Sequence, residues 1–316
     1  MGTSLMKPRI GITLGDCAGI GPEIVELALK SRRISDSPEY VVIGRQPNCK
    51  SGEPTPETGR AAAAALEEAV TLARRGELDA IVTGPVHKAR MYEIGFRFPG
   101  QTEFFAERCG VTNFAMCLTG GKLCVALVTA HIPLRKVPRT LKQPEIVRVG
   151  LLLEEFLRSR GKTVPRIAVA GLNPHAGESG KLGGEEIAII SPAIAALKSE
   201  SQNPKSEITG PHSPDTVFHR AIDGEFDAVL CMYHDQGLIP LKLHAFYSGV
   251  NVTLGLPFPR TSPDHGTAFE IAGQGVARPD SMISAINLAV ELARKNDEAR
   301  IPNVEEIPKC LNDEPL

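Results

Sequence analysis

Three histidines in this sequence each come directly after a short apolar run: His131 in LVTAHIPL, His175 in AGLNPHAGE and His234 in LCMYHDQG. The runs are typical of buried parallel strands, and open α/β sheets bind ligands outside the carboxyl ends of such strands. Three neutral imidazoles with one open coordination position often hold a catalytic zinc ion or a similar divalent metal. A histidine after a strand is also frequently a hydrogen-bonded loop residue, so position alone leaves a metal site and a structural role open.

A glycine-rich segment, GDCAGIGP, follows the first apolar run from Gly15 to Pro22. It stands where a strand is expected to lead into a helix, which is the usual place of a loop whose amide groups bind a phosphate or a dinucleotide. Its glycines do not follow the G-x-G-x-x-G order, and the Lys-Ser/Thr pair of a P-loop is missing. A phosphate-binding loop and a tight structural turn therefore both remain open.

Alternating strands and helices have to position these side chains. Seven runs that are apolar on both faces predict buried strands at residues 9–14, 40–43, 80–83, 123–129, 167–170, 228–232 and 250–254. Stretches between them predict helices at 22–32, 58–75, 145–160, 185–199 and 281–295. Segments 46–57 and 199–210 predict surface loops, and the tail after Arg300 predicts an extended strap. The alternation predicts an α/β fold with a mostly parallel sheet.

The composition excludes several classes of protein. Among 316 residues, 35 Lys and Arg stand against 37 Asp and Glu, a net charge of −2, so no basic surface for nucleic acid is expected. No run reaches the ~18 apolar residues that would span a bilayer, and the first residues lack the apolar stretch of a signal peptide. The seven cysteines are odd in number and form no C-x-x-C pair, which disfavours a disulfide scaffold. We expect a cytoplasmic protein of about two domains.

The segment from Thr261 to Asp280, TSPDHGTAFEIAGQGVARPD, resembles the cofactor loop of isocitrate and isopropylmalate dehydrogenases. That loop has the pattern H-G-[ST]-A-x-x-I-A-G-x-G-x-A-x-P and cradles the adenosine part of a dinucleotide, and every specified position is matched here, from His265 to Pro279. Glycines let the backbone approach the cofactor, and a helix start favours negative charge. The resemblance implies bound NAD or NADP, with contacts from Gly255, Leu256, Pro257, Asp264, His265, Gly266, Thr267, Ala268 and Gly273.

Over nearly its whole length the sequence resembles the 4-hydroxythreonine-4-phosphate dehydrogenase family of pyridoxal phosphate biosynthesis. The resemblance rests on GITLGD and AGIGPEI, TGPVHK, FPGQTEFFA, TAHIPLR, GLNPHAGE, MYHDQGLIPLK and GVNVTLGLPFPRTSPDHGTA, in this order. It implies two α/β domains around a cleft, in an isocitrate/isopropylmalate dehydrogenase-like fold. Residues 1–130 with about 281–316 would form the first domain, and residues 131–280, with the metal and cofactor loops, the second. It also implies a homodimer with the active site at the subunit interface.

The same resemblance implies roles for individual residues. His131, His175 and His234 correspond to the family's ligands for one divalent metal ion, such as zinc, magnesium, cobalt or manganese. Substrate contacts map to Gln101, Thr102, Lys242, Asn251 and Arg260, and the implied catalytic set is Asp235, Lys242 and Asp215. Cationic and hydroxyl donors suit a phosphate monoester. The implied reaction is NAD(P)-linked oxidation of 4-phosphooxy-L-threonine to a β-keto acid, which decarboxylates to 3-amino-2-oxopropyl phosphate, with Asp235 or Lys242 moving the proton.

Two departures from the family leave other functions open. The family's P-G-H-T-E is replaced by Pro99-Gly100-Gln101-Thr102-Glu103, so an uncharged amide stands in place of a histidine that helps to hold substrate. The segment from 44 to 59 is shorter than usual, so we expect the edge of the first domain to be trimmed. A dehydrogenase of erythronate or threonate 4-phosphate and a binding homologue without turnover therefore remain as alternatives.

Overall fold

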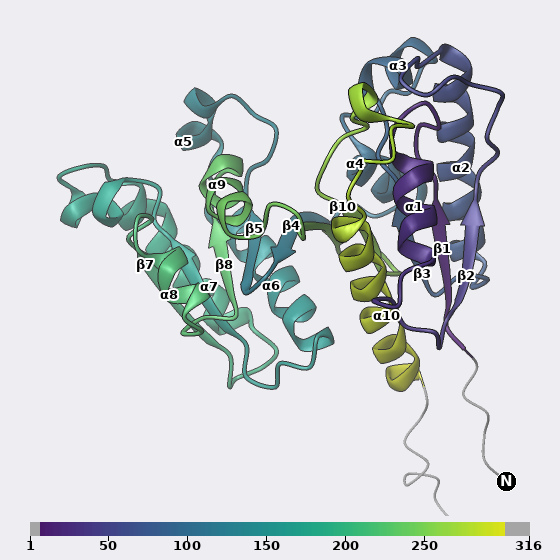
Figure 1. Ribbon diagram of the computed structural model, residues 1–316. Helices are drawn as coiled ribbons and strands as arrows, with labels where there is room; N and C mark the ends of the chain where they lie inside the picture. The colour runs from purple at the N-terminus through teal and green to yellow at the C-terminus, as the bar shows by residue number, and fades with distance from the viewer. Residues whose placement is uncertain (1–6, 301–316) are drawn as a thin grey trace, which may run out of the picture.

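The computed structural model describes residues 7–300, which form one ten-stranded sheet in the order β2-β1-β3-β10-β9-β4-β5-β8-β6-β7 (Figure 1). The strands are β1 (Arg9–Thr13), β2 (Glu39–Ile43), β3 (Ala80–Thr83), β4 (Ala115–Gly120), β5 (Leu123–Leu127), β6 (Arg166–Ala170), β7 (Glu207–His212), β8 (Ala228–Cys231), β9 (Val250–Leu254) and β10 (Arg260–Pro263). Neighbouring strands are antiparallel only around the middle, at β10–β9, β9–β4 and β4–β5. The predicted α/β fold with a mostly parallel sheet is confirmed.

Helices cover both faces of the sheet and form two lobes that meet at its middle strands (Figure 1). The first lobe contains α1 (Gly21–Leu29), α2 (Pro56–Arg74), α3 (Lys88–Glu93), α4 (Gln101–Arg108), η4 (Phe269–Ile271) and α10 (Asp280–Arg300). The second contains η1 (Leu134–Lys136), α5 (Val137–Thr140), α6 (Gln143–Ser159), η2 (Pro174–Gly180), η3 (Glu186–Ile190), α7 (Ser191–Glu200), α8 (Val217–Ile222) and α9 (His234–Ala245). Within residues 7–300, no helix has the length and apolarity needed to cross a membrane.

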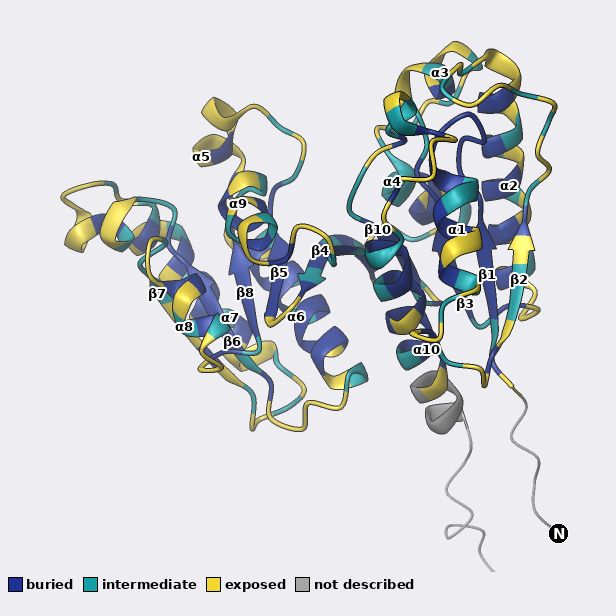
Figure 2. Ribbon diagram, viewed as in Figure 1, coloured by how far each residue is buried: buried dark blue, intermediate teal, exposed yellow. Residues whose placement is uncertain are grey.

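Burial on both faces explains why inner strands such as β3 and β8 are made almost entirely of apolar residues (Figure 2). Ile10 and Ile12 in β1 and Val229 in β8 are completely buried, because helices pack above and below them. The longest predicted helix of the first lobe, α2, starts with a capping box in which Thr55 and Thr58 satisfy each other's backbone N–H groups. The buried strands and the capped helix give the turns that follow the strands a packed framework.

The structure contains elements that periodicity does not reveal. Strands β4, β7 and β10 are missing from the prediction, and the expected loop at 199–210 is wrong at its end, where β7 begins at Glu207. β7 is an edge strand with mostly exposed residues, so it lacks the apolar pattern of a buried strand. His234 begins α9 instead of lying in a loop, and Pro240 inside that helix weakens the helical signal. The tail predicted after Arg300 lies outside the described residues.

The sheet order suggests where the two domains divide. Strands β4 and β5, which lie before residue 130, pair with β9 and β8, whereas β10, which lies within 131–280, pairs with β3. We therefore propose a first domain of about residues 7–114 and 255–300 and a second of about 115–254, in place of the expected divisions at 130 and 281. With this division, the two domains join at the antiparallel pair of strands β9 and β10.

Candidate active site

Ten residues expected in the site line one cavity of about 440 Å³. They are Gln101, Thr102, His131, His234, Lys242, Asn251, Arg260, Asp264, His265 and Gly266. They come from α4, the turn after β5, α9, β9, and β10 with the loop that follows it. The cavity therefore draws on both lobes, and the sheet order brings together segments that are far apart in the sequence.

Arg260 is a buried cation in the wall of this cavity, with 2% of its surface exposed. Its Nη2 donates hydrogen bonds to Thr83 Oγ1 at 2.6 Å and Gln101 Oε1 at 2.8 Å, and its Nη1 donates to Thr253 Oγ1 at 3.3 Å. All three partners are neutral. Burial lowers the pKa of Arg260 to about 10, and the negative charge of Glu103 only partly opposes this. A buried cation with neutral partners costs the fold free energy that a bound anion can offset.

Four polar atoms at the cavity are buried and have no hydrogen-bond partner among the described residues: Glu103 Oε2, Asn251 Oδ1, Arg260 Nε and His265 Nε2. Buried polar atoms of folded proteins are nearly always paired. His265 Nδ1 lies 3.1 Å from the carbonyl oxygen of Gly266, and burial lowers the pKa of His265, so the neutral ring donates there and presents Nε2 as an acceptor. The four atoms fit a ligand that carries an anion close to hydroxyl or amino groups.

His131 and His234 lie beside each other, with ring centroids 5.5 Å apart and ring planes inclined by 43°. His234 Nδ1 is 2.7 Å from Asp235 Oδ1, which orients the ring and leaves coordination to Nε2. His131 has a φ of 50°, a left-handed conformation that is strained for a non-glycine residue and is found preferentially at functional sites. Loss of hydration lowers the pKa of His131, and the charge of Lys88 adds to this, so the ring is neutral, as a metal ligand must be.

His175 and Asp215 do not line this cavity. His175 is exposed in η2 of the second lobe, in a turn whose residues 175–179 all have positive φ. Asp215 is also exposed, and a hydrogen bond from Ser213 lowers its pKa, with a small addition from His175. In the part of the chain that the structure describes, no three His, Cys, Asp or Glu side chains gather to hold a metal ion. One chain thus brings together two of the three histidines.

The turn that carries His175 is held by the buried carboxylate of Glu186. Its Oε1 accepts hydrogen bonds from the backbone N–H groups of Leu172 at 2.8 Å and Asn173 at 2.7 Å, and its Oε2 accepts one from the Asn173 side chain at 2.9 Å. Burial alone would raise the pKa of Glu186, but these hydrogen bonds hold it below its ordinary value. Glu186 cannot be recognised as a site residue from the sequence, because nothing local in GGEEIA connects it with a turn thirteen residues upstream.

Lys242 forms an ion pair with Asp264 at the cavity. Its Nζ is 2.8 Å from Asp264 Oδ2 and also donates to the backbone oxygen of Asp264 at 3.2 Å. Lys242 lies on α9 about two turns beyond His234, so both side chains project from the same face of the helix. Asp235 is exposed, is absent from the cavity wall and contacts His234. Lys242 therefore faces the ligand, whereas Asp235 orients a histidine.

Only the first part of the expected cofactor loop lines the cavity. Behind it, the backbone N–H of Ile20 donates to the Thr267 oxygen at 2.9 Å, and a Cβ on Gly19 would lie 2.7 Å from that oxygen. The glycine-rich segment after β1 is therefore a turn that packs against the cofactor loop, which explains its glycine at position 19 and favours the structural interpretation. Ala268, the next residue of the loop, has a φ of 43°.

The remaining expected cofactor residues lie around other hollows. Gly255 and Leu256 line one beside Phe258, Pro257 lines a second, and Gly273 lines a third near α1. Several cavity residues escaped our assignment of site residues although they stand in quoted motifs. Thr83 and Lys88 lie in TGPVHK and Glu103 in FPGQTEFFA, and Thr253, which contacts Arg260 from behind the cavity wall, lies in GVNVTLG. Their positions within these motifs would have identified them as candidate site residues.

Residues 21–289 match the family described as "Pyridoxal phosphate biosynthetic protein PdxA". The chain is 44% identical over 329 residues to 4-hydroxythreonine-4-phosphate dehydrogenase of Desulfosudis oleivorans, a match that covers 91% of this chain and 96% of the relative. It is 40% identical over 331 residues to D-threonate 4-phosphate dehydrogenase of Pectobacterium atrosepticum, covering 91% of this chain and 100% of the relative.

Among solved structures, 4-hydroxythreonine-4-phosphate dehydrogenase from Klebsiella pneumoniae is similar with a TM-score of 0.78 and 40% identity, covering 91% of this chain and 100% of that one. Isocitrate dehydrogenase from Methylococcus capsulatus is similar with a TM-score of 0.51 and 17% identity, covering 93% of this chain and 88% of that one. The second likeness concerns the fold alone, and it confirms the expected isocitrate dehydrogenase-like architecture.

Proposed function

The chain belongs to the family of the pyridoxal phosphate biosynthetic protein PdxA, and from this premise we propose that it oxidises 4-phosphooxy-L-threonine with NAD or NADP. The enzyme is a dehydrogenase that acts on a CH–OH group. The β-keto acid formed loses carbon dioxide and gives 3-amino-2-oxopropyl phosphate, a precursor of pyridoxine 5'-phosphate. The six cysteines of the described residues are free thiols, which supports a reducing, cytoplasmic location.

The buried guanidinium of Arg260 supports this proposal most directly. It has only neutral hydrogen-bond partners and an unused Nε, so it can bind the phosphate of the substrate. Thr102 adds a hydroxyl donor, and the unpaired Asn251 Oδ1 can accept from the substrate's amino or hydroxyl group. These groups would bind the phosphate and the amino acid portion of the substrate in the same cavity.

A divalent metal ion would supply a Lewis acid that lowers the pKa of the substrate hydroxyl. His131 and His234 fit such an ion, since their neighbouring rings line the cavity and Asp235 orients His234. Imidazole ligands favour zinc over magnesium. One chain provides an incomplete ligand set, and we assign the third position to His175 of the partner subunit.

We assign proton transfer at the substrate to Lys242. Its Nζ lies in the cavity wall, and Asp264 Oδ2 holds it by an ion pair, so a proton can be exchanged with the substrate without moving the backbone. Asp235 and Asp215, which we also expected to be catalytic, are exposed and absent from the cavity wall. We give Asp235 the role of orienting His234 and leave Asp215 to the partner's site, beside His175.

Asp264, His265 and Gly266 would hold a nicotinamide cofactor at the cavity, and the cofactor would supply the hydride acceptor. The neutral His265 can accept a hydrogen bond from the cofactor through the unpaired Nε2. The loop from Thr267 to Gly273 continues toward α1 and suits the adenosine part. NAD and NADP both remain candidates.

An exposed apolar stripe on α9 supports a homodimer. Ile239, Leu243 and Phe246, with the adjoining Tyr247, are spaced along one side of the helix that carries His234, and Leu243 is 88% exposed. A second copy covering this stripe would lie next to the metal-binding histidines. The stripe therefore suits a dimer in which the partner completes each site.

D-threonate 4-phosphate is the second candidate substrate, because one relative carries that activity in its name and because residue 101 departs from the family pattern. Gln101 is fixed by two hydrogen bonds: its Oε1 accepts from Arg260, and its Nε2 donates to the Gly84 oxygen at 3.1 Å. Gln101 therefore presents an uncharged hydrogen-bond acceptor to the guanidinium that is proposed to bind the phosphate. A sugar acid phosphate differs from the amino acid by a hydroxyl in place of the amine.

A substrate panel tests the proposal. Purified protein with a divalent metal should reduce NAD or NADP with 4-phosphooxy-L-threonine, read as the absorbance of the reduced cofactor, and a chelator should abolish the rate. Faster turnover of D-threonate or D-erythronate 4-phosphate would replace the substrate and keep the reaction class. Turnover that survives metal removal would contradict the roles given to His131, His175 and His234.

A further inference from the structure

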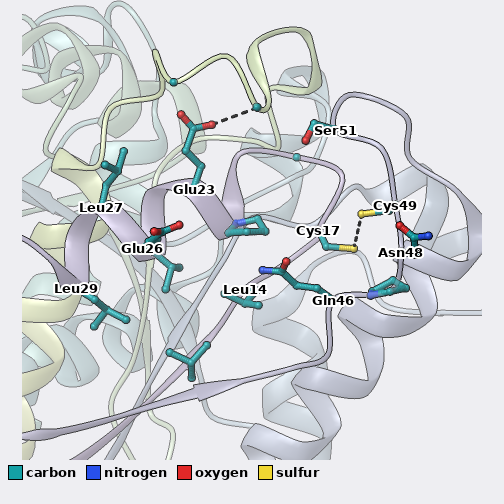
Figure 3. Close-up of a pocket in the computed structure, with 17 residues that line it drawn as sticks. Leu14, Cys17, Glu23, Glu26, Leu27, Leu29, Gln46, Asn48, Cys49 and Ser51 are labelled. Atoms are coloured by element: carbon teal, nitrogen blue, oxygen red, sulfur yellow. Dashed lines mark hydrogen bonds between the residues drawn. The ribbon is translucent and has the colours of Figure 1, made fainter.

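Two cysteines from separate loops lie next to each other in the first lobe (Figure 3), outside the cavity that holds the histidines but at a hollow that Gly273 of the expected cofactor loop also lines. Cys17 Sγ, in the glycine-rich turn after β1, is 3.3 Å from Cys49 Sγ, in the segment that joins β2 to α2. They are 32 residues apart in the chain. Neither cysteine has a role in the proposed reaction, so the reaction does not explain why the two lie together.

Small molecules can reach both sulfur atoms. Cys17 and Cys49 line an open hollow of about 890 Å³ together with Gln46, Asn48 and Ser51 (Figure 3). Cys49 is the more exposed of the two, on a surface segment without a helix or strand, whereas only 9% of Cys17 is exposed. A reactive cysteine needs such access.

The surrounding backbone keeps the two loops in register. The N–H of Gly52 donates to the Ala18 oxygen at 2.7 Å, one residue beyond Cys17 and three beyond Cys49. Ala18 N–H in turn donates to Asp16 Oδ1 at 3.1 Å. A disulfide requires the two sulfur atoms to approach to about 2.05 Å, and the loop that carries Cys49 can supply that small movement while the Gly52 hydrogen bond stays in place.

We propose that Cys17 and Cys49 form an oxidisable dithiol, a modification site at which a hydroperoxide converts two thiols into one intramolecular disulfide. The thiolate of Cys49 attacks the peroxide, the O–O bond breaks, and Cys49 becomes a sulfenic acid while water or an alcohol leaves. Cys17 Sγ then attacks the Cys49 sulfur and displaces water, so two thiols are oxidised as one hydroperoxide is reduced. A small dithiol reverses the reaction by exchange.

The protein contains a second cysteine pair that serves as an internal contrast. Cys117 Sγ in β4 lies 3.6 Å from Cys124 Sγ in β5, nearly as close as the first pair. Both are buried in the sheet, with 0% and 4% exposure, and neither lines any of the hollows described above. Proximity is shared by the two pairs, but access is not.

Burial raises the pKa of Cys17 to about 12, so its oxidation should speed up with pH.

Closing the disulfide would tie the short 44–59 segment to a turn that also packs on the loop after β10. Ile20 N–H bonds the Thr267 oxygen, and the Gly273 N–H lies 3.3 Å from Glu23 Oε2. Ser51 lies against Gly273 on the other side. Oxidation should therefore stiffen three loops at once, and cross-linking a loop of this length should raise the melting temperature by about 5 °C or more.

The experiment treats the folded, full-length protein with hydrogen peroxide, blocks remaining thiols after denaturation, and maps the peptides by mass spectrometry. We expect a peptide in which Cys17 is joined to Cys49, a mass loss of about 2 Da that a dithiol reverses, and a higher melting temperature. Cys117 and Cys124 should remain fully labelled. The variants Cys49→Ser and Cys17→Ser should lose the cross-link and the thermal shift.

Cys49→Ser is the decisive variant, because its side chain lies on the surface and its loss should leave the fold intact. A matched Cys124→Ser protein should still form the Cys17–Cys49 link. The proposal is overturned if Cys17 and Cys49 stay labelled after peroxide, if Cys49 is oxidised only to a sulfinic acid, or if the cross-link joins any other pair of cysteines.

Discussion

Arg260 lowers the stability of the fold because its charge is buried, and the same charge can bind the substrate. Burial lowers the pKa of Arg260 to about 10. At neutral pH its guanidinium is therefore charged in an environment that solvates the charge less well than water does. The buried charge lowers the stability of the fold at every pH below about 10, and this destabilisation decreases only as the pH rises above the folded pKa. A residue that costs stability and lines a cavity is retained for what it binds.

Arg260→Met should separate the two effects. We expect kcat/KM for the phosphorylated substrate to fall by about 10- to 100-fold, because charged hydrogen bonds to the phosphate are lost. The melting temperature should stay the same or rise, because an apolar side chain replaces a buried charge. Steady-state kinetics and thermal unfolding check both. A melting temperature several degrees lower, with kcat/KM unchanged, would instead make Arg260 a structural residue.

Gln101→His tests the substrate at the same scale. An imidazole N–H can donate a hydrogen bond to the phosphate, whereas the amide oxygen of Gln101 accepts one from Arg260. We expect kcat/KM to rise for 4-phosphooxy-L-threonine by up to about 30-fold, the ratio that corresponds to 1–2 kcal/mol, whereas Gln101→Asn should lower it. No gain in Gln101→His, together with turnover of threonate phosphate, would assign the cavity to the sugar acid.

At the scale of elements, the turn of residues 172–180 depends on a carboxylate that lies outside it. Five consecutive residues, 175–179, have positive φ, which is strained for the four that are not glycine. Glu186 fixes the start of this turn through the Leu172 and Asn173 backbone N–H groups. Since these bonds hold its folded pKa below the ordinary value, their stabilisation is present at neutral pH and is lost as the pH falls through the folded pKa.

Glu186→Gln should destabilise the fold by about 1–3 kcal/mol at neutral pH, because an amide NH₂ then faces backbone N–H donors. The loss of stability on acidification should be smaller in this variant than in the parent. Urea unfolding at several pH values measures both. Glu185→Gln is the matched control, since Glu185 makes only a side-chain contact with Asn173 Nδ2; an equal effect in both variants would refute the special role of Glu186.

Helix α9 has two sides with different tasks. One side presents His234 and Lys242 to the cavity, and the other exposes Ile239 and Leu243. Leu243→Glu should convert the proposed dimer into a monomer, because burying a carboxylate in an apolar interface is costly. Light scattering coupled to gel filtration measures the mass, and Val42→Glu on the edge strand β2, where Val42 is also exposed, is the control. A Leu243→Glu protein that stays dimeric would show that α9 is not the interface.

At the scale of the whole molecule, the separation of His175 from His131 and His234 predicts a shared site. His175→Ala and His131→Ala should each abolish metal binding and turnover. Mixed dimers of the two variants should regain activity, because one of their two sites then has an intact His131, His234 and partner histidine. Co-expression with two affinity tags isolates the mixed dimers. Persistent inactivity of these mixed dimers would mean that each chain builds its site alone.

Much of the fold follows from local pattern. Residues 9–14, 80–83 and 228–232 are apolar on both faces, which only a covered parallel strand explains, and each is a strand in the structure. β7 and α9 escape because their patterns are set by their surroundings: an edge strand needs no apolar face, and a helix with an interior proline and an exposed apolar stripe has no simple polar side. Their identities depend on neighbours that lie far away in the sequence.

The sequence by itself determined the fold class, the family and ten of the residues that line the cavity, because motifs and short-range periodicity are written along the chain. Only the tertiary structure decided that His175 and Asp215 stand apart from the other site residues, that Arg260 is buried among neutral partners, and that Glu186 holds a distant turn. These facts concern distances and burial, which follow from how ten strands are ordered in one sheet. Strand order is fixed by long-range packing, and no local pattern encodes it.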